Sequence, residues 1–188
     1  MMAIPTTKLT SFAPGHDNVD TIQARVGYVE ANLLRIHYLA HCDIARLKLP
    51  AQSLPRRADR LWEHTCFEAF IRSDNDPSYY EFNFSPSGGW AVYGFHGYRD
   101  GGPIQDEGVS PDFAVRRAAD RIELDAVLRL DGLPAIRPGS LLRIGLSAVI
   151  ESSDGTLSYW ALKHPAAKPD FHHPESFVLE LPFPSQSA

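Results

Sequence analysis

Residues 65–85 read TCFEAFIRSDNDPSYYEFNFS, and this stretch decides the predicted fold. Apolar side chains recur at every second position in 65–72 and again in 79–85, which is the period of a β-strand with one buried face. Between the two runs stands SDNDP at 73–77, a cluster of residue types that favour turns. The stretch therefore predicts two strands joined by a turn.

The same alternation extends along the rest of the chain. In 121–130 and 141–150 the even-numbered residues are all apolar, whereas most of the odd positions are charged or small residues. Further strands are predicted at 24–29, 33–41, 90–98, 113–117, 157–163 and 176–181. No segment keeps a helical period for more than about two turns. We therefore expect an all-β fold, a two-sheet antiparallel β-sandwich with little helix, in a single domain spanning residues 1–188.

Composition narrows the classes of partner. The 188 residues carry 18 Lys and Arg against 23 Asp and Glu, a net charge of −5, and no basic block that would bind a phosphate backbone. No apolar run approaches the roughly 18 residues of a membrane span, and the first residues lack the pattern of a signal peptide. Two cysteines are too few for a disulfide scaffold. We expect a cytoplasmic protein without nucleic-acid or membrane partners, and the oligomeric state stays open.

The polar face of the predicted sheet collects residues suited to a ligand. If the apolar positions face the core, then Glu68, Glu81, Asn83 and Arg143 share the opposite face. Carboxylates, an amide and a guanidinium near aromatic rings predict a platform for a small polar ligand. Charged residues on neighbouring strands also form structural cross-strand pairs, so that interpretation stands beside the first.

Aromatic and imidazole side chains extend this candidate site. A sugar offers an apolar C–H face ringed by hydroxyl groups, so a flat ring beside carboxylate or amide groups suits it. Trp62 and Trp160 both stand next to predicted loops and are candidates for stacking, although packing in the core is the alternative for each. His164 and His172, in the loop HPAAKPDFHHP at 164–174, are candidates for the rim of the site.

Other kinds of function remain as alternatives. Glu68 and Glu81 are a possible carboxylate pair for a hydrolase, and the His-rich loop is a possible metal site, although its spacing matches no known pattern. Cys66 and His64 form a conceivable nucleophile pair, but a strand cysteine is more often packed and inert. A structural or interaction protein without a small ligand is the remaining alternative. We expect no catalytic residue, no metal and no cofactor.

Four short motifs also resemble a known group. They are EAFI at 68–71, YYEF at 79–82, SPSG at 85–88 and FHHP at 171–174. Over about residues 61–181 the chain resembles the DOMON-like proteins related to the family 9 carbohydrate-binding module. The resemblance implies a two-sheet sandwich and a non-catalytic role in binding a saccharide, with Glu68, Glu81 and Asn83 as polar partners and Trp62 and Trp160 as stacking rings.

The resemblance also raises the possibility of haem. DOMON relatives that hold haem use a methionine and a histidine as axial ligands. The methionines here are Met1 and Met2, which leaves ligation by two histidines as the alternative.

Overall fold

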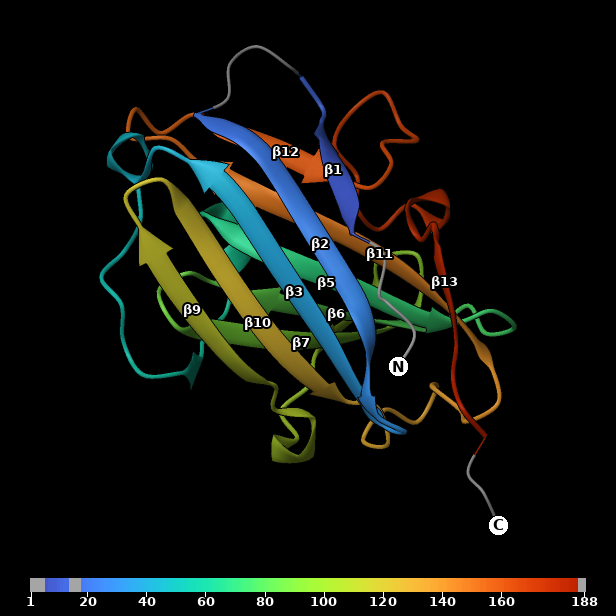
Figure 1. Ribbon diagram of the computed structural model, residues 1–188. Coiled ribbons are helices and arrows are strands. Elements are labelled where there is room, and N and C mark those ends of the chain that lie inside the picture. Colours follow the sequence, from blue (N-terminus) through green and yellow to red (C-terminus); the bar gives the residue numbers. More distant parts are fainter. Residues whose placement is uncertain (1–5, 14–17, 186–188) are drawn as a thin grey trace.

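The computed structural model describes residues 6–13 and 18–185 and is built almost entirely of strands (Figure 1). The strands are β1 (Thr7–Ser11), β2 (Val19–Glu30), β3 (Leu33–Cys42), β4 (Arg56–Arg57), β5 (Cys66–Ser73), β6 (Tyr79–Phe84), β7 (Gly89–Gly97), β8 (Asp100–Pro103), β9 (Asp112–Ala118), β10 (Arg121–Arg129), β11 (Leu141–Glu151), β12 (Leu157–Ala161) and β13 (Leu179–Pro182). Helical turns are short 3-10 segments: η1 (Ile44–Arg46), η2 (Leu61–Glu63), η3 (Glu107–Val109) and η4 (Pro174–Ser176). None of the helices in the described ranges is long and apolar enough to cross a membrane.

The strands form one hydrogen-bonded path in the order β4-β7-β6-β5-β11-β12-β1-β2-β3-β10-β9, with β13 added beside β11 and β8 beside β7. Neighbours on this path are antiparallel, apart from the parallel pair β4 and β7. The expected antiparallel, nearly all-β fold is confirmed. The expected division into two sheets is not: β1 pairs with both β2 and β12, so the path curls continuously from one layer into the other.

The core lies between the two layers, where β2, β3 and β10 cross β5, β6 and β7 (Figure 1). Phe67, Ala69 and Ile71 of β5 point into it and are fully buried. Tyr38 of β3 packs against Phe67, with ring centroids 5.2 Å apart. The even-numbered residues of β10 and β11 also belong to this core, as their alternation predicted.

The predicted strands correspond to strands of the structure, with differences at the ends. β1, β4 and β8 were not predicted: β4 has only 2 residues, and β8 is the glycine-containing DGGP. A strand was expected to begin at residue 176, but Pro174–Ser176 forms η4 and β13 begins at Leu179. Proline at the first position suits a helical turn, because its fixed φ is compatible with that turn and its missing N–H is not needed there.

One hydrogen bond joins the layers at the strand that carries the polar face. The hydroxyl group of Tyr38 donates to the backbone carbonyl of Glu68 over 2.6 Å, and both residues are buried. Tyr28 offers a contrast, because its buried hydroxyl oxygen has no hydrogen-bond partner among the described residues.

We predict that Tyr38→Phe lowers the free energy of unfolding by about 1–3 kcal/mol, because the buried Glu68 carbonyl group would lose the hydrogen bond from the Tyr38 hydroxyl group. Thermal unfolding followed by circular dichroism measures the change, at about 2–4 °C per kcal/mol for a chain of this size. Tyr28→Phe is the matched control and should change stability little. Equal effects of the two variants would contradict the role given to the Tyr38 hydroxyl group.

Candidate ligand-binding site

A pocket of about 530 Å³ opens on the face of β5, β6 and β7 that is turned away from the core. Strand register creates its floor, because Phe70 pairs with Glu81 and Glu81 pairs with Tyr93, while Glu68 pairs with Asn83. Directly opposed residues share a face, so Glu68 and Glu81 lie on the same face, at diagonal positions of adjacent strands. The lining residues are Asp59, Trp62, Glu68, Glu81, Tyr93, Phe95, Arg99, Gly101, Gly102, Pro103, Val149, Tyr159, Pro169, Phe171 and His172.

Two buried carboxyl groups form the polar floor of the pocket. Glu68 is 3% exposed and Glu81 is 5% exposed. The Ser147 hydroxyl group donates to Glu68 Oε2 over 3.4 Å, and the Asn83 amide donates to Glu81 Oε1 over 2.7 Å. Each carboxyl group therefore has one side-chain hydrogen bond from the sheet and further acceptor capacity toward the pocket.

Burial and mutual repulsion disfavour the charged forms of this pair. Burial raises the pKa of Glu81 to about 7, against the lowering influence of Asn83 and Arg99. Burial and the nearby charge of Glu81 raise the pKa of Glu68 well above its ordinary value. The pair consequently holds at least one proton near neutral pH.

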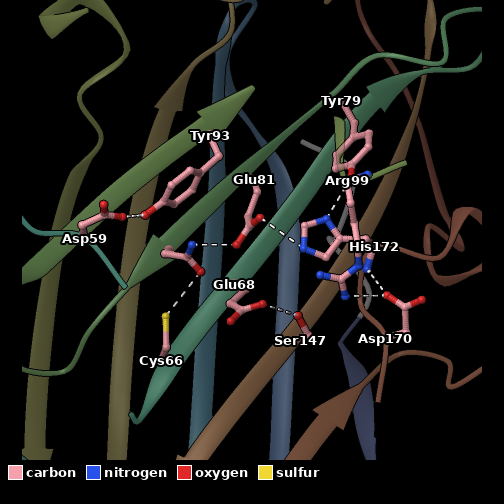
Figure 2. Close-up of polar contacts among 11 residues, drawn as sticks. Asp59, Cys66, Glu68, Tyr79, Glu81, Tyr93, Arg99, Ser147, Asp170 and His172 are labelled. Carbon is pink, nitrogen blue, oxygen red and sulfur yellow. Dashed lines mark hydrogen bonds and ion pairs between the residues drawn. The ribbon is translucent and has the colours of Figure 1, made fainter. Parts of the chain in front are cut away.

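A hydrogen-bonded chain fixes His172 above this floor (Figure 2). The backbone N–H of Arg99 donates to the Tyr79 hydroxyl oxygen over 3.0 Å, and this hydroxyl group lies 2.8 Å from His172 Nδ1. Burial, together with the charge of Arg99, lowers the pKa of His172 to about 4, so the ring is neutral at neutral pH. If Tyr79 donates to Nδ1, the ring proton lies on Nε2, which is 3.6 Å from Glu81 Oε2.

Two loop segments close one side of the pocket and are tied together by an ion pair. Arg99 lies in the tight turn between β7 and β8, and its guanidinium donates to Asp170 Oδ1 over 2.9 Å. Tyr98 donates to the other oxygen of Asp170 over 2.7 Å. Burial alone would raise the pKa of Asp170, but the hydrogen bonds from Tyr98 and Arg99 outweigh it and lower the pKa.

The backbone is strained at both edges of the pocket. In the described part of the chain, the non-glycine residues with positive φ are Arg60, at 57°, and Arg99, at 56°. Arg60 directly precedes η2, which carries Trp62, and Arg99 precedes β8. Residues other than glycine adopt this backbone conformation at a cost of order 1–3 kcal/mol, and such strained residues are frequent at ligand sites.

Aromatic rings stand on opposite sides of the carboxyl groups in the strand order. Trp62 is 39% exposed and meets Tyr93 of β7 edge to face, with centroids 5.5 Å apart. Tyr159 of β12 and Phe171 lie 6.3 Å apart on the other side. The Tyr93 hydroxyl group donates to Asp59, which holds the ring in position at the pocket wall.

The structure brings together some of the predicted site residues. Trp62, Glu68, Glu81 and His172 line the pocket, and Asn83 lies fully buried behind Glu81. Asn83 also accepts a hydrogen bond from the Cys66 thiol at 3.4 Å, and burial raises the pKa of that thiol well above its ordinary value. Asn83 therefore positions Glu81 from below.

Arg143, Trp160 and His164 do not line the pocket. Arg143 shares the outer face but lies near the far end of β11, where it is paired with Asp74 and Glu180. Trp160 is opposed to Ala148 and belongs to the core, so its ring is not available for stacking.

His164 is held at the opposite end of its loop, where its Nε2 is 2.9 Å from the carbonyl oxygen of Thr10. Phe12 packs edge to face on the same ring, with centroids 5.3 Å apart. The backbone and aromatic contacts of His164 therefore give it a packing role.

Several lining residues were missed from the sequence. Tyr93 and Tyr159 stand at positions whose side chains point to the polar face. They could have been predicted from the alternation of their strands if the strand order had been known. Asp59, Arg99 and Phe171 come from loops and carry no periodic signal. Within residues 6–13 and 18–185, no three His, Cys, Asp or Glu side chains gather in a way that would hold a metal ion.

We predict that Glu81→Gln stabilises the protein at about pH 8 by on the order of 1–3 kcal/mol, with a smaller gain at about pH 5. A carboxyl group whose pKa rises from 4.5 to about 7 on folding contributes less stability as the pH rises through that interval. Thermal melts of the variant and the parent protein at both pH values measure the difference.

The control is Glu151→Gln, because Glu151 is a buried glutamate of the same sheet whose pKa is lowered. Burial raises that pKa, but hydrogen bonds from Lys48 and His64 outweigh it. Its substitution should therefore destabilise the protein more at pH 8 than at pH 4. A destabilising effect of Glu81→Gln at pH 8 would contradict the charge cost assigned to the pocket floor.

Sequence comparison and structure comparison give different results. No protein-family model matches the chain, and no curated protein sequence is similar to it. Among solved structures, a candidate carbohydrate-binding protein from Bacteroides uniformis is similar, with a TM-score of 0.67 and 16% sequence identity, over 93% of this chain and 84% of that chain.

A family 9 carbohydrate-binding module from Caldicellulosiruptor kristjanssonii is also similar. Its complex with cellotriose has a TM-score of 0.58 and 9% identity, over 98% of this chain and 84% of that chain. Its complex with glucose has the same TM-score and identity, over 98% of this chain and 86% of that chain. At these identities the likeness shows the fold alone, which is similar to that of the carbohydrate-binding module; the expected relation to DOMON-like proteins stays a prediction.

Proposed function

We propose that this protein binds a saccharide in the pocket above β5 and β6 and does not transform it. The observation that carries the proposal is one cavity that joins an exposed tryptophan ring, Trp62, to the two buried carboxyl groups of Glu68 and Glu81. The exposed indole is available for stacking on a ligand, and buried carboxyl groups are costly without a partner.

The chemistry of these groups matches that of a sugar. A pyranose ring has an apolar C–H face that packs on an indole, and such contacts are worth about 0.5–1.5 kcal/mol beyond the buried area. Its hydroxyl groups are donors that suit carboxylate acceptors, at roughly 1.5–3 kcal/mol for each hydrogen bond to a charged group. After the cost of immobilising the ligand, a few such contacts give affinities from millimolar to micromolar.

Each residue then has a defined part. Trp62 stacks on the sugar, Glu68 and Glu81 accept hydrogen bonds from hydroxyl groups, and Asn83 holds Glu81 in orientation. The fold supports saccharide binding in general, because the similar module from Caldicellulosiruptor kristjanssonii was solved with glucose and with cellotriose.

A glycoside hydrolase is the second candidate, and the carboxyl pair is the observation that favours it. Glycosidases use one protonated and one ionised carboxyl group, and the raised pKa values of Glu68 and Glu81 provide that combination. We prefer simple binding, because the similar structures are described as binding proteins and modules. Hydrolysis of cellotriose or another oligosaccharide, lost in Glu81→Gln, would replace this proposal.

We predict that at least one sugar in a panel of neutral, acidic and amino sugars stabilises the protein against heat. At about 100 times its dissociation constant a ligand adds about 2.7 kcal/mol, which corresponds to a shift of about 5 °C or more. Trp62→Ala should weaken this binding about tenfold, since it removes the stacking surface.

Arg143→Gln is the control, because Arg143 is a polar residue of the same face outside the pocket, and its substitution should leave affinity unchanged. Titration calorimetry with the parent protein and both variants gives the affinities. If no sugar of the panel binds, or if both variants lose affinity equally, the proposal is contradicted. Either result would favour an interaction protein whose polar groups on this face bond to one another.

A further inference from the structure

We infer that the sugar bound by this pocket carries a protonated amine, so that the ligand class is an amino sugar rather than a neutral one. The inference rests on the proposed function and deepens it. It follows from the balance of charge around the cavity, from the kind of rings that wall it and from the acceptor groups left without a partner.

The charges around the pocket do not balance. Among the described lining residues the acidic side chains are Asp59, Glu68 and Glu81, and Arg99 is the cationic one. Arg99 is already paired with Asp170, whose side chain is 6% exposed, at 2.9 Å. The guanidinium charge is thus shared with an acid behind it. Among the described residues Glu68 has no ion-pair partner, and Glu81 has only the His172 ring nearby, at 3.6 Å.

The imidazole ring of His172, which also lies near the two glutamates, does not supply a positive charge. The Nδ1 atom of His172 lies 2.8 Å from the Tyr79 hydroxyl oxygen, and the His172 side chain is 14% exposed. Because burial and the neighbouring Arg99 lower its pKa to about 4, it faces Glu81 as a neutral ring. Among the described lining residues, no cation is therefore left to compensate the two glutamates when they ionise, and a ligand can supply one.

The walls are suited to a cation as well as to a sugar ring. Trp62 and Tyr93 stand on one side, and Tyr159 and Phe171 stand on the other. The faces of such rings attract ammonium groups through their quadrupoles, with the greatest effect in a desolvated site. A neutral sugar gains from stacking on these rings, whereas an amino sugar gains from both stacking and charge.

The acceptor geometry favours an ammonium group over a hydroxyl group. Glu68 and Glu81 lie at diagonal positions of adjacent strands, and both line the cavity. An ammonium group has three donors and no acceptor, and it can donate to both carboxylates at once, whereas a hydroxyl group has one donor. A bound ammonium also takes the place of the proton that the pair holds in the empty pocket.

Titration calorimetry at about pH 6.5 with glucosamine, glucose and N-acetylglucosamine tests the inference. The three share a pyranose ring, and glucosamine alone of them is charged. We expect glucosamine to bind at least about tenfold more tightly than glucose, since hydrogen bonds to charged groups are stronger than neutral ones. Heats measured in two buffers of different ionisation enthalpy should show release of a proton on binding glucosamine and none on binding glucose.

Two variants locate the effect. Glu81→Gln keeps an acceptor oxygen and removes the charge, so it should weaken binding of glucosamine much more than binding of glucose and thereby abolish the preference. Glu151→Gln removes the same charge from the same sheet outside the pocket, where Glu151 is paired with Lys48 and His64. It should keep the preference, which separates a local contact from the net charge of the protein.

Each outcome decides a different point. Equal or tighter binding of glucose or N-acetylglucosamine overturns the inference and leaves the proposed function in place. Failure of every sugar overturns both. Binding of choline, a cation without a sugar ring, in the absence of any sugar binding also overturns both, because it would make the pocket a site for simple ammonium ions.

Discussion

The arrangement of the site depends on the burial of one face of β5 and β6. Phe67, Ala69 and Ile71 have to face the core, and the period of a strand then forces Glu68 onto the other side. A slip of one residue would bury the carboxyl group in the apolar core and expose the aromatic rings. The hydrogen bond from Tyr38 to the Glu68 carbonyl fixes this register from across the core, at the residue that also forms the pocket floor.

This constraint explains why the outer face is not an ordinary solvated sheet surface. Glu68 and Glu81 would be exposed if the strands stood alone, but β8 and the loop around Asp170 and His172 cover them. The ion pair between Arg99 and Asp170 joins β8 to this loop, and Arg99 has a strained backbone conformation with positive φ. Covering a carboxyl group costs free energy, so the core and the ladder hydrogen bonds stabilise a site that is itself unfavourable when empty.

Alternation predicted which residues share a face but not where along the strands they lie. It placed Glu68, Glu81 and Asn83 on one face correctly, because β5 and β6 are neighbours in the sheet and these three residues occupy adjacent positions of its outer face. Arg143 has the same parity, yet it lies outside the pocket near the start of β11, among other charges. The covering loops owe their positions to contacts between distant parts of the chain, such as the one between Arg99 and Asp170, and no local pattern reports such contacts.

The fold and the ligand chemistry are separate properties of this molecule. The shape that it shares with carbohydrate-binding modules persists at 9% identity, because it requires apolar residues at alternate positions and little else. The polar face is under no such requirement, so its charges are free to differ among proteins of the same shape. Here that face joins two buried carboxyl groups to a neutral histidine and to an arginine already paired with another acid. The identity of the ligand therefore has to be argued from the charges within this pocket, since the fold supplies the cavity and leaves its chemistry open.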